Sequence, residues 1–376
     1  MKNIKQLIYN MLQSILPEMW AINLWVQYVK HNPAYSENTH QYGYFLSKKK
    51  SKKRYCILRY PKFYGIGAVM KHSLLQCEWA VRNQMIPVID YEWDYYYAED
   101  VIGRDNGWEY VFKPNASLQE IVEQGNNMYV FVGAIGGRYA DKLTKRELGS
   151  KDGRVIFAEE NWREYYRNLN MLSNKWWRLH DDVAARYEAF FSKLFSPDMK
   201  ILGVALREEF SIDAEKEKME ELKQHPHHLT LDEMIRVIKE YKTRWECTHV
   251  FVTTYFEDSI IKLKEEFGDA LLYTDRRRVL YEQFHEIRRL VEDQYYRTNK
   301  RREFVEWIKS DDEQAQIIDT SDKNTMIEYV EEIYGLSLCD CLIAGKSGGA
   351  LCACAWNGGK YKEMEILSDN NDSILY

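Results

Sequence analysis

Short apolar strands alternate with amphipathic helices along most of this chain. In the first half, an apolar run at residues 55–60 precedes a glycine loop, a helical pattern over 69–83 and a second apolar run at 87–90. This order of strand, loop, helix and strand is a βαβ unit, which is almost always a right-handed crossover in a parallel sheet. A chain built from such units is expected to be an α/β protein, with helices covering the faces of its sheets.

The second half shows the same alternation. Strands are expected at 201–206, 249–254, 270–273 and 339–344, and helices at 232–245, 257–267, 323–338 and 350–356. The chain has 376 residues, which is enough for two domains with cores of ordinary size. The sequence therefore predicts two Rossmann-like, doubly wound domains that face each other across a central cleft.

A Ser-Pro-Asp turn at 196–198 separates the two halves and is typical of a hinge. It divides the chain into a helical leader with a basic loop (1–53), an N-terminal domain (54–197) and a C-terminal domain (198–376).

The net charge of the protein and the residues at its N-terminus indicate which partners it binds and where in the cell it lies. The net charge of −6 gives no overall attraction for nucleic acid. The basic run at 48–54 is expected to be a solvated loop, with contact to anionic lipid or phosphate as the alternative. The first 30 residues lack about 20 uninterrupted apolar residues, so they predict an amphipathic helix packed on the body and not a membrane span. We expect a cytoplasmic protein, with peripheral attachment to the inner membrane face through residues 1–54 as the alternative.

The cysteines indicate buried thiols and no metal centre. The seven cysteines are an odd number and most lie in apolar runs, which is typical of a reducing compartment. Two C-x-C pairs occur, at 339–341 and 352–354, but no C-x-x-C or H-x-x-x-H accompanies them. We therefore expect neither a metal nor another cofactor.

Three loops at the carboxyl ends of predicted strands in the second half are expected to converge. They carry Arg207, Thr254 and the Ser347-Gly348 turn. Ligands of open α/β sheets bind at this edge, and arginine holds phosphate in a bidentate geometry. A serine and glycine turn entering a helix offers a hydroxyl and backbone N–H groups to a second phosphate oxygen. This combination suits a nucleoside diphosphate without a metal.

Other candidate residues leave alternatives open. Gly65 and Gly67 precede a helix, where they form either an anion site or a plain tight turn. Asp340 begins a buried strand and needs a partner, either a nucleobase amide or a nearby backbone group. His225 precedes a proline and orders a loop over the donor or simply a turn into the next helix.

The order of several motifs resembles the fucosyltransferase superfamily, which includes α1,6-fucosyltransferases and rhizobial nodulation-factor fucosyltransferases. The motifs are RYPKFYGIGAV, IPVIDYE, NGWEYVFKP, LGVALR, HPHHLTLDEMI, FVTTYFEDSIIKLKEEFGDALLYTDRR and EYVEEIYGLSLCDCLIAGKSGGA. The resemblance covers roughly residues 55–356 and implies a GT-B-like fold, with the N-terminal domain on the acceptor side and the C-terminal domain binding the nucleotide sugar. It also implies metal-independent, inverting transfer of fucose from GDP-fucose to a glycan or lipid-linked glycan acceptor, in the synthesis of a bacterial surface polysaccharide.

The resemblance also assigns roles to individual residues. It places Arg207 and Ser347 on the diphosphate, Asp340 near the guanine, and Gly65 and Gly67 in the loop that closes over the donor. The chain departs from the family where Glu208, Glu209 and Phe210 follow the arginine. This departure motivates an alternative function, a degenerate member that binds nucleotide or glycan as a non-enzymatic partner in glycan assembly.

Inverting transfer asks for a base that accepts the proton of the acceptor hydroxyl. Glu209 and Asp213 lie in the loop after Arg207 and are the two candidates for this base. The alternative for both is a solvated loop carboxylate. Arg207 is expected to stabilise the departing diphosphate, together with Ser347.

Overall fold

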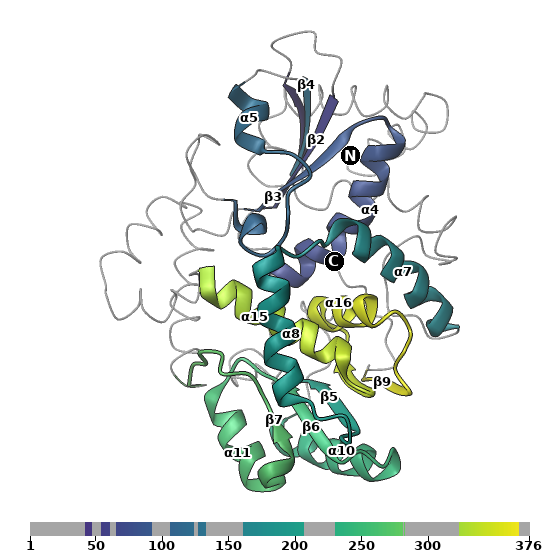
Figure 1. Ribbon diagram of the computed structural model, residues 1–376, viewed down its shortest axis with the longest axis vertical. Helices are drawn as coiled ribbons and strands as arrows, with labels where there is room; N and C mark the ends of the chain where they lie inside the picture. The colour runs from purple at the N-terminus through teal and green to yellow at the C-terminus, as the bar shows by residue number, and fades with distance from the viewer. Residues whose placement is uncertain are drawn as a thin grey trace, which may run out of the picture.

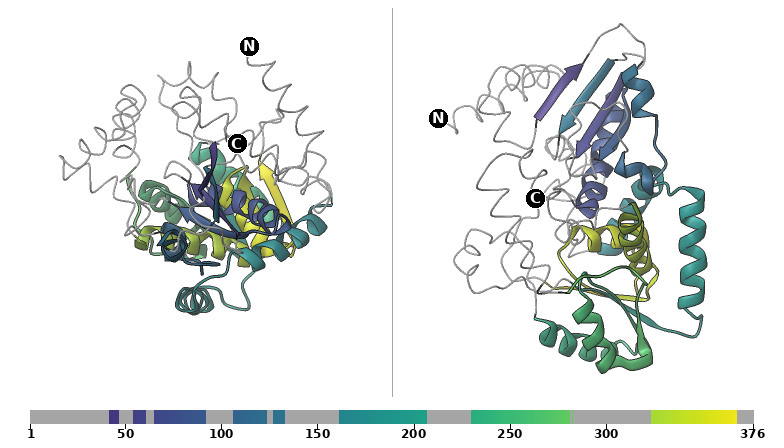
Figure 2. Two further views of the ribbon diagram at one scale, coloured as in Figure 1. Left: turned by 90° about the horizontal axis from the view of Figure 1, so that it is seen from above. Right: turned by 90° about the vertical axis from the view of Figure 1, so that its left-hand side faces the viewer.

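The computed structural model describes residues 42–46, 54–60, 65–91, 106–123, 127–132, 161–206, 230–280, 282 and 323–367. These residues form two separate β-sheets with helices around them, one above the other along the long axis of the molecule (Figures 1 and 2). The arrangement confirms the predicted α/β fold class with two Rossmann-like sheets. The rest of the predicted leader and the charged helical stretch after Leu280 lie outside the described residues.

The first sheet has the strand order β1-β4-β2-β3. Its strands are β1 (Tyr42–Leu46), β2 (Arg54–Tyr60), β3 (Ile86–Tyr91) and β4 (Asn127–Val132). Strand β2 runs parallel to β3 and β4, whereas β1 runs antiparallel to β4. The helical elements of this half are α4 (Ile66–Arg82), the 3-10 helix η1 (Gly107–Tyr110) and α5 (Leu118–Glu123). The β2-α4-β3 crossover is the predicted βαβ unit.

The second sheet has the order β7-β6-β5-β8-β9, and each neighbouring pair of described strands is parallel. Its strands are β5 (Ile201–Ala205), β6 (His249–Thr253), β7 (Leu271–Leu272), β8 (Cys341–Gly345) and β9 (Glu363–Leu367). Its helices are α10 (Leu231–Arg244), α11 (Glu257–Phe267), η5 (Gly268–Ala270), α15 (Lys323–Leu338) and α16 (Gly348–Asn357). The central strands are buried on both faces, which is why they are continuous apolar runs in the sequence.

Two helices lie between β4 and β5 in the chain and pack on helices α16 and α15 of the second half. They are α7 (Trp162–Trp176) and α8 (Asp181–Leu194). Asn170 on α7 donates to the carbonyl of Ala355 at 2.9 Å, and the Tyr187 hydroxyl on α8 donates to the carbonyl of Ile327 at 2.6 Å. Figure 1 shows α8 crossing α15. The domain boundary at residue 197 stays a prediction, but the helix before it packs on the half that follows it.

One apolar core spans both sheets. It contains Leu58 of β2, Val69 of α4 and Leu351 of α16, together with Phe251 of β6. The ring of Phe191 on α8 lies edge-on to Phe251, with the ring centroids 5.7 Å apart. A second cluster covers the other face of the second sheet beneath α10 and α11. The two halves are therefore joined by shared apolar packing.

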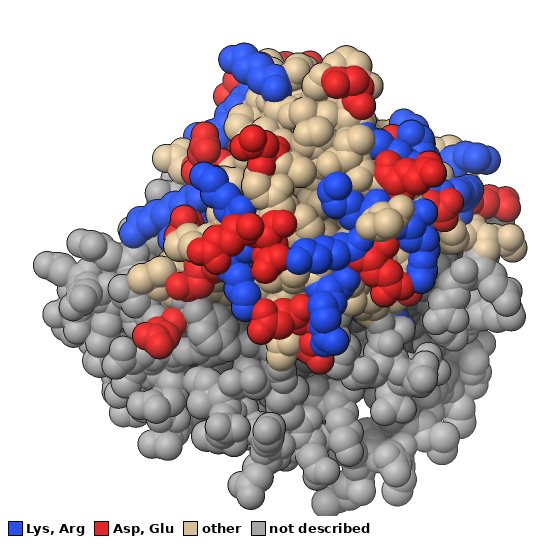
Figure 3. Space-filling model, turned by 90° about the horizontal axis from the view of Figure 1, so that it is seen from below, with Lys and Arg blue, Asp and Glu red and all other residues tan. Residues whose placement is uncertain are grey.

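The face seen from below carries Lys and Arg interspersed with Asp and Glu (Figure 3). On α10 and α11, opposite charges are paired between the helices and within a turn: Lys239 with Glu266, Lys262 with Asp232, and Arg244 with Glu240. Such paired, exposed charges contribute little to stability. In the part of the chain that the structure describes, no helix is both long and apolar enough to cross a membrane.

Candidate functional site

The amino-terminal turns of α4 and α16 touch each other, backbone to backbone. A Cβ atom on Gly67 would lie 2.7 Å from the amide nitrogen of Gly349, and one on Gly348 would lie 3.0 Å from the carbonyl carbon of Gly67. Side chains at Gly67 and Gly348 would therefore force the helices apart. Helix α4 follows β2, and α16 follows β8. This contact, which we call the glycine junction, joins the carboxyl edges of the two sheets.

Both helix starts at the glycine junction favour an anion. Neither first turn carries an acidic residue. Ser347 is the N-cap of α16 and its Oγ accepts a hydrogen bond from the Ala350 N–H at 3.2 Å. Gly65 is the N-cap of α4, has extended backbone angles and provides no side-chain cap. Free N–H groups and the helix dipoles from both directions meet at this place, which is where the sequence predicted a phosphate site.

The structure thus brings Gly65, Gly67, Ser347 and Gly348 together, although the two pairs lie in different halves of the sequence. Thr254 lies at the carboxyl end of β6, at the same edge of the second sheet. Its side chain is buried and its Oγ1 accepts a hydrogen bond from the Phe256 N–H at 3.1 Å, so it shapes the turn into α11.

The remaining predicted residues of this edge lie outside the described residues. They are Arg207, Glu209, Asp213 and His225. Strand β5 is described up to its carboxyl end, where the Leu206 N–H donates to the carbonyl of Thr253 at 3.0 Å. The roles given to these four residues stay predictions.

Asp340 does not join the group at the glycine junction. It precedes β8 and so lies at the amino edge of the second sheet, the opposite edge from Ser347. Its Oδ2 accepts a hydrogen bond from the Ile201 N–H at 2.9 Å, and its Oδ1 lies 2.6 Å from Lys362 Nζ. Asp340 and Ser347 therefore lie at opposite edges of the sheet, and the role of Asp340 near the guanine stays a prediction. Of the two partners considered, the nearby backbone is the one the structure shows.

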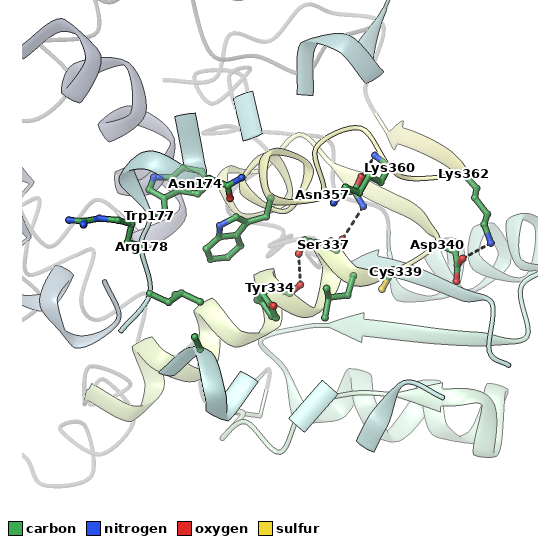
Figure 4. A pocket seen from close by; sticks show the side chains of 14 residues that line it. Asn174, Trp177, Arg178, Tyr334, Ser337, Cys339, Asp340, Asn357, Lys360 and Lys362 are labelled. Carbon is green, nitrogen blue, oxygen red and sulfur yellow. Dashed lines mark hydrogen bonds and ion pairs between the residues drawn. The ribbon is translucent and has the colours of Figure 1, made fainter. Parts of the chain in front are cut away.

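A cavity of about 670 Å³ lies beside Asp340, on this amino edge. Figure 4 shows Lys362 pointing at Asp340 at one end of the cavity and Arg178 pointing away from it. The polar groups between them satisfy one another: Ser337 donates to the Tyr334 carbonyl at 2.6 Å, and Asn357 donates to the Ser337 carbonyl at 2.9 Å. Because these polar groups bind one another, they do not indicate a ligand-binding site in this cavity.

A buried charge network lies at the carboxyl edge of β6 and β7, and it was not among the predicted site residues. Glu332 on α15 accepts from Arg276 Nη1 at 2.7 Å, from Arg278 Nη2 at 3.1 Å and from Thr274 Oγ1 at 3.1 Å. The guanidinium of Arg276 lies over the rings of Tyr255 and Tyr329, 5.2 and 5.1 Å from their centroids. Burial lowers the pKa of Arg276, but Glu332, together with Tyr255 and Tyr329, raises it by more, so Arg276 is held as a cation.

The seven cysteines are all buried free thiols, which confirms that prediction. Burial raises the pKa of Cys339 well above its usual range and that of Cys354 to about 12. Within the described part of the chain, no three His, Cys, Asp or Glu side chains are grouped so that they could hold a metal ion.

Comparison with known proteins gives matches among solved structures. No model of a known protein family matches the sequence, and a search of curated proteins finds no match. The structure is similar to that of NodZ α1,6-fucosyltransferase co-crystallised with GDP, with 14% identity and a TM-score of 0.43 over 81% of this chain and 92% of that one. It is similar to fucosyltransferase NodZ from Bradyrhizobium, with 14% identity and a TM-score of 0.42 over 81% and 92% of the two chains. It is also similar to POFUT1 in complex with GDP, with 9% identity and a TM-score of 0.44 over 83% and 98%. Fucosyltransferases are thus among the solved structures that this chain is similar to, and they are the family that its motifs resemble.

Proposed function

We propose that this protein is a glycosyltransferase that transfers fucose from GDP-fucose to a glycan acceptor. The observation that carries the proposal is the glycine junction, where the two loops expected to bind phosphate contact each other across the two halves of the chain. The order of the sequence motifs supports the identity of the donor. The product is part of a bacterial surface polysaccharide, and this step of the proposal rests on the sequence resemblance alone.

In the proposed reaction, the acceptor hydroxyl attacks the anomeric carbon of the fucose as the bond from that carbon to the diphosphate oxygen breaks. The configuration is inverted and GDP leaves. The charge that develops on the diphosphate is stabilised by the N–H groups at the start of α16, by Ser347 and by Arg207, without a metal ion. The proton of the hydroxyl passes to a carboxylate, for which Glu209 and Asp213 are the candidates.

Calorimetric titration with GDP, UDP, GDP-fucose and UDP-glucose tests the donor. We expect GDP and GDP-fucose to bind and the uridine compounds to bind at least tenfold more weakly. Arg207→Ala should weaken GDP binding at least tenfold. Arg236 is an exposed arginine on α10 of the same half, and Arg236→Ala should bind GDP as tightly as the wild type does. Absence of binding to every nucleotide would refute the proposal.

A turnover assay separates the enzyme from a protein that only binds the nucleotide. Release of free fucose from GDP-fucose, lost in Arg207→Ala and retained in Arg236→Ala, is the result expected of a transferase. Tight GDP-fucose binding with no hydrolysis and no transfer to any glycan would instead support the non-enzymatic alternative.

A further inference from the structure

Among the described residues, the charge network around Glu332 holds two guanidinium cations and one carboxylate. Arg276 and Arg278 both bind the Glu332 carboxylate, and all three side chains are at most 5% exposed. A buried charge that is not compensated costs free energy unless another partner is supplied. The network therefore favours one additional negative group.

Arg278 has more of its donors bound within the network than Arg276 has, although the buried Nε of each arginine lacks a hydrogen-bond partner among the described residues. The Nη1 atom of Arg278 donates to the carbonyls of Thr274 at 2.9 Å and of Arg276 at 3.1 Å, so it closes the loop after β7. Arg276 is bound through Nη1 alone among the described residues, and its buried Nε has no hydrogen-bond partner there. Glu332 and Arg278 thus hold Arg276 in place without using all of its donors.

Arg276 lies next to the glycine junction. Its guanidinium packs on the Tyr329 ring, and the Tyr329 hydroxyl lies 2.8 Å from the position that a Cβ on Gly349 would take. One tyrosine ring therefore separates Arg276 from the first turn of α16. The two tyrosine rings pack against the guanidinium, and a positioned guanidinium suits bidentate binding of a phosphate.

We propose that Arg276 is a phosphate-binding residue at this edge, where it contacts the diphosphate of a nucleotide held at the glycine junction. The guanidinium packs against the rings of Tyr255 and Tyr329, and Glu332 binds its Nη1. The assignment deepens the proposed function, because it adds a cation to the donor site, but it can be tested without a sugar or a transfer reaction.

The experiment is calorimetric titration with inorganic pyrophosphate, GDP and guanosine. The variants are Arg276→Gln, Arg276→Lys and, as the matched control, Arg277→Gln, which changes the exposed neighbouring arginine. We expect Arg276→Gln to weaken pyrophosphate and GDP at least tenfold and to leave guanosine within twofold of the wild type. Arg276→Lys should lie between them, since lysine keeps the charge but not the planar fork. Arg277→Gln should bind pyrophosphate as the wild type does.

Thermal unfolding of each variant shows whether it is folded. If Arg276→Gln does not fold, Arg276→Lys decides, because it keeps a cation beside Glu332. If folded Arg276→Gln binds pyrophosphate as tightly as the wild type does, the assignment is overturned. When only Arg276→Lys folds, wild-type affinity in that variant overturns it. A wild type that binds no pyrophosphate also overturns it. Transfer from GDP-fucose with unchanged affinities in Arg276→Gln would reject Arg276 and retain the proposed function. If pyrophosphate binding depends on Arg276 but no nucleotide sugar binds, Arg276 is retained as a phosphate-binding residue and the proposed function is rejected.

Discussion

Asp340 and Ser347 lie at opposite ends of strand β8, Asp340 before its first residue and Ser347 after its last. A five-residue strand spans about 13 Å between its end residues. Ser347 therefore faces the glycine junction, and Asp340 faces the cavity at the amino edge. The two residues serve different ends of the sheet.

Asp340→Ala should therefore destabilise the protein without weakening nucleotide binding. It leaves the Ile201 N–H without its acceptor, at a cost of about 1–3 kcal/mol in the free energy of unfolding. Asp340→Asn keeps an acceptor and should cost less. Urea unfolding and GDP titration of both variants check this. A fivefold loss of GDP affinity in folded Asp340→Asn would contradict this expectation and would favour a contact between Asp340 and the guanine.

Gly67→Ala should open the glycine junction. The added methyl group meets the backbone of Gly349, which cannot rotate away as a side chain can, so we expect a loss of about 1–3 kcal/mol in the free energy of unfolding. Gly65→Ala is the matched control, because a Cβ there meets nothing within 4 Å and should change stability by less than about 0.5 kcal/mol. Equal effects of the two substitutions in urea unfolding would show that the helices do not touch.

Glu331→Gln should stabilise the protein increasingly as the pH rises. Burial raises the pKa of Glu331, and Arg186, whose Nε lies 3.4 Å away, lowers it by less. The folded state therefore keeps the proton to a higher pH than the unfolded state, and wild-type stability falls as the pH rises from about 4.5 through the folded pKa. Glutamine does not titrate and escapes this loss.

Urea unfolding at pH 4, 5, 6 and 7 measures the effect. The difference between Glu331→Gln and the wild type should be small at pH 4 and larger at pH 7. Glu265→Gln, which makes the same change of charge at an exposed position of α11 away from Glu331, is the control. A difference that shrinks toward neutral pH would show that the ion pair with Arg186 outweighs burial.

The native protein should react very slowly with a thiol reagent at pH 8. Reaction needs an accessible thiolate, and all seven cysteines are buried, with the pKa of Cys354 raised to about 12. We expect less than one thiol to be titrated in the native state and seven in 8 M urea without a reductant. Fewer than seven in urea would reveal a disulfide.

Local sequence patterns were sufficient for most elements of the fold. Helix α11 was expected at 257–267 and is found at Glu257–Phe267, where Gly268 ends it with a φ of 53°. Strand β9 was not predicted, because it alternates charged and apolar residues at the edge of the sheet and is held only through its pairing with β8. Strand β1 was missed as well, within a stretch that was predicted to be a loop.

The sequence was sufficient to predict the individual glycine loops of the site, but not their contact with each other. Each glycine loop could be recognised as an anion site from its place between a strand and a helix. Their mutual contact depends on the packing of the two halves, which no local pattern contains. Arg276 belongs to a run of three arginines that resembles a solvated segment, and its burial depends on Glu332, 56 residues further along the chain. The direction of β8 was the available signal that separates Asp340 from Ser347.

The apolar core that runs from β2 through α4 and α16 to β6 has a consequence for folding. Neither half encloses a complete hydrophobic interior, and α8, which precedes the expected hinge at 196–198, covers α15 of the other half. The chain should therefore unfold in one cooperative transition and not lobe by lobe. A fragment of residues 198–376 would expose the surface that α7, α8 and α4 cover, and we expect it to aggregate instead of folding.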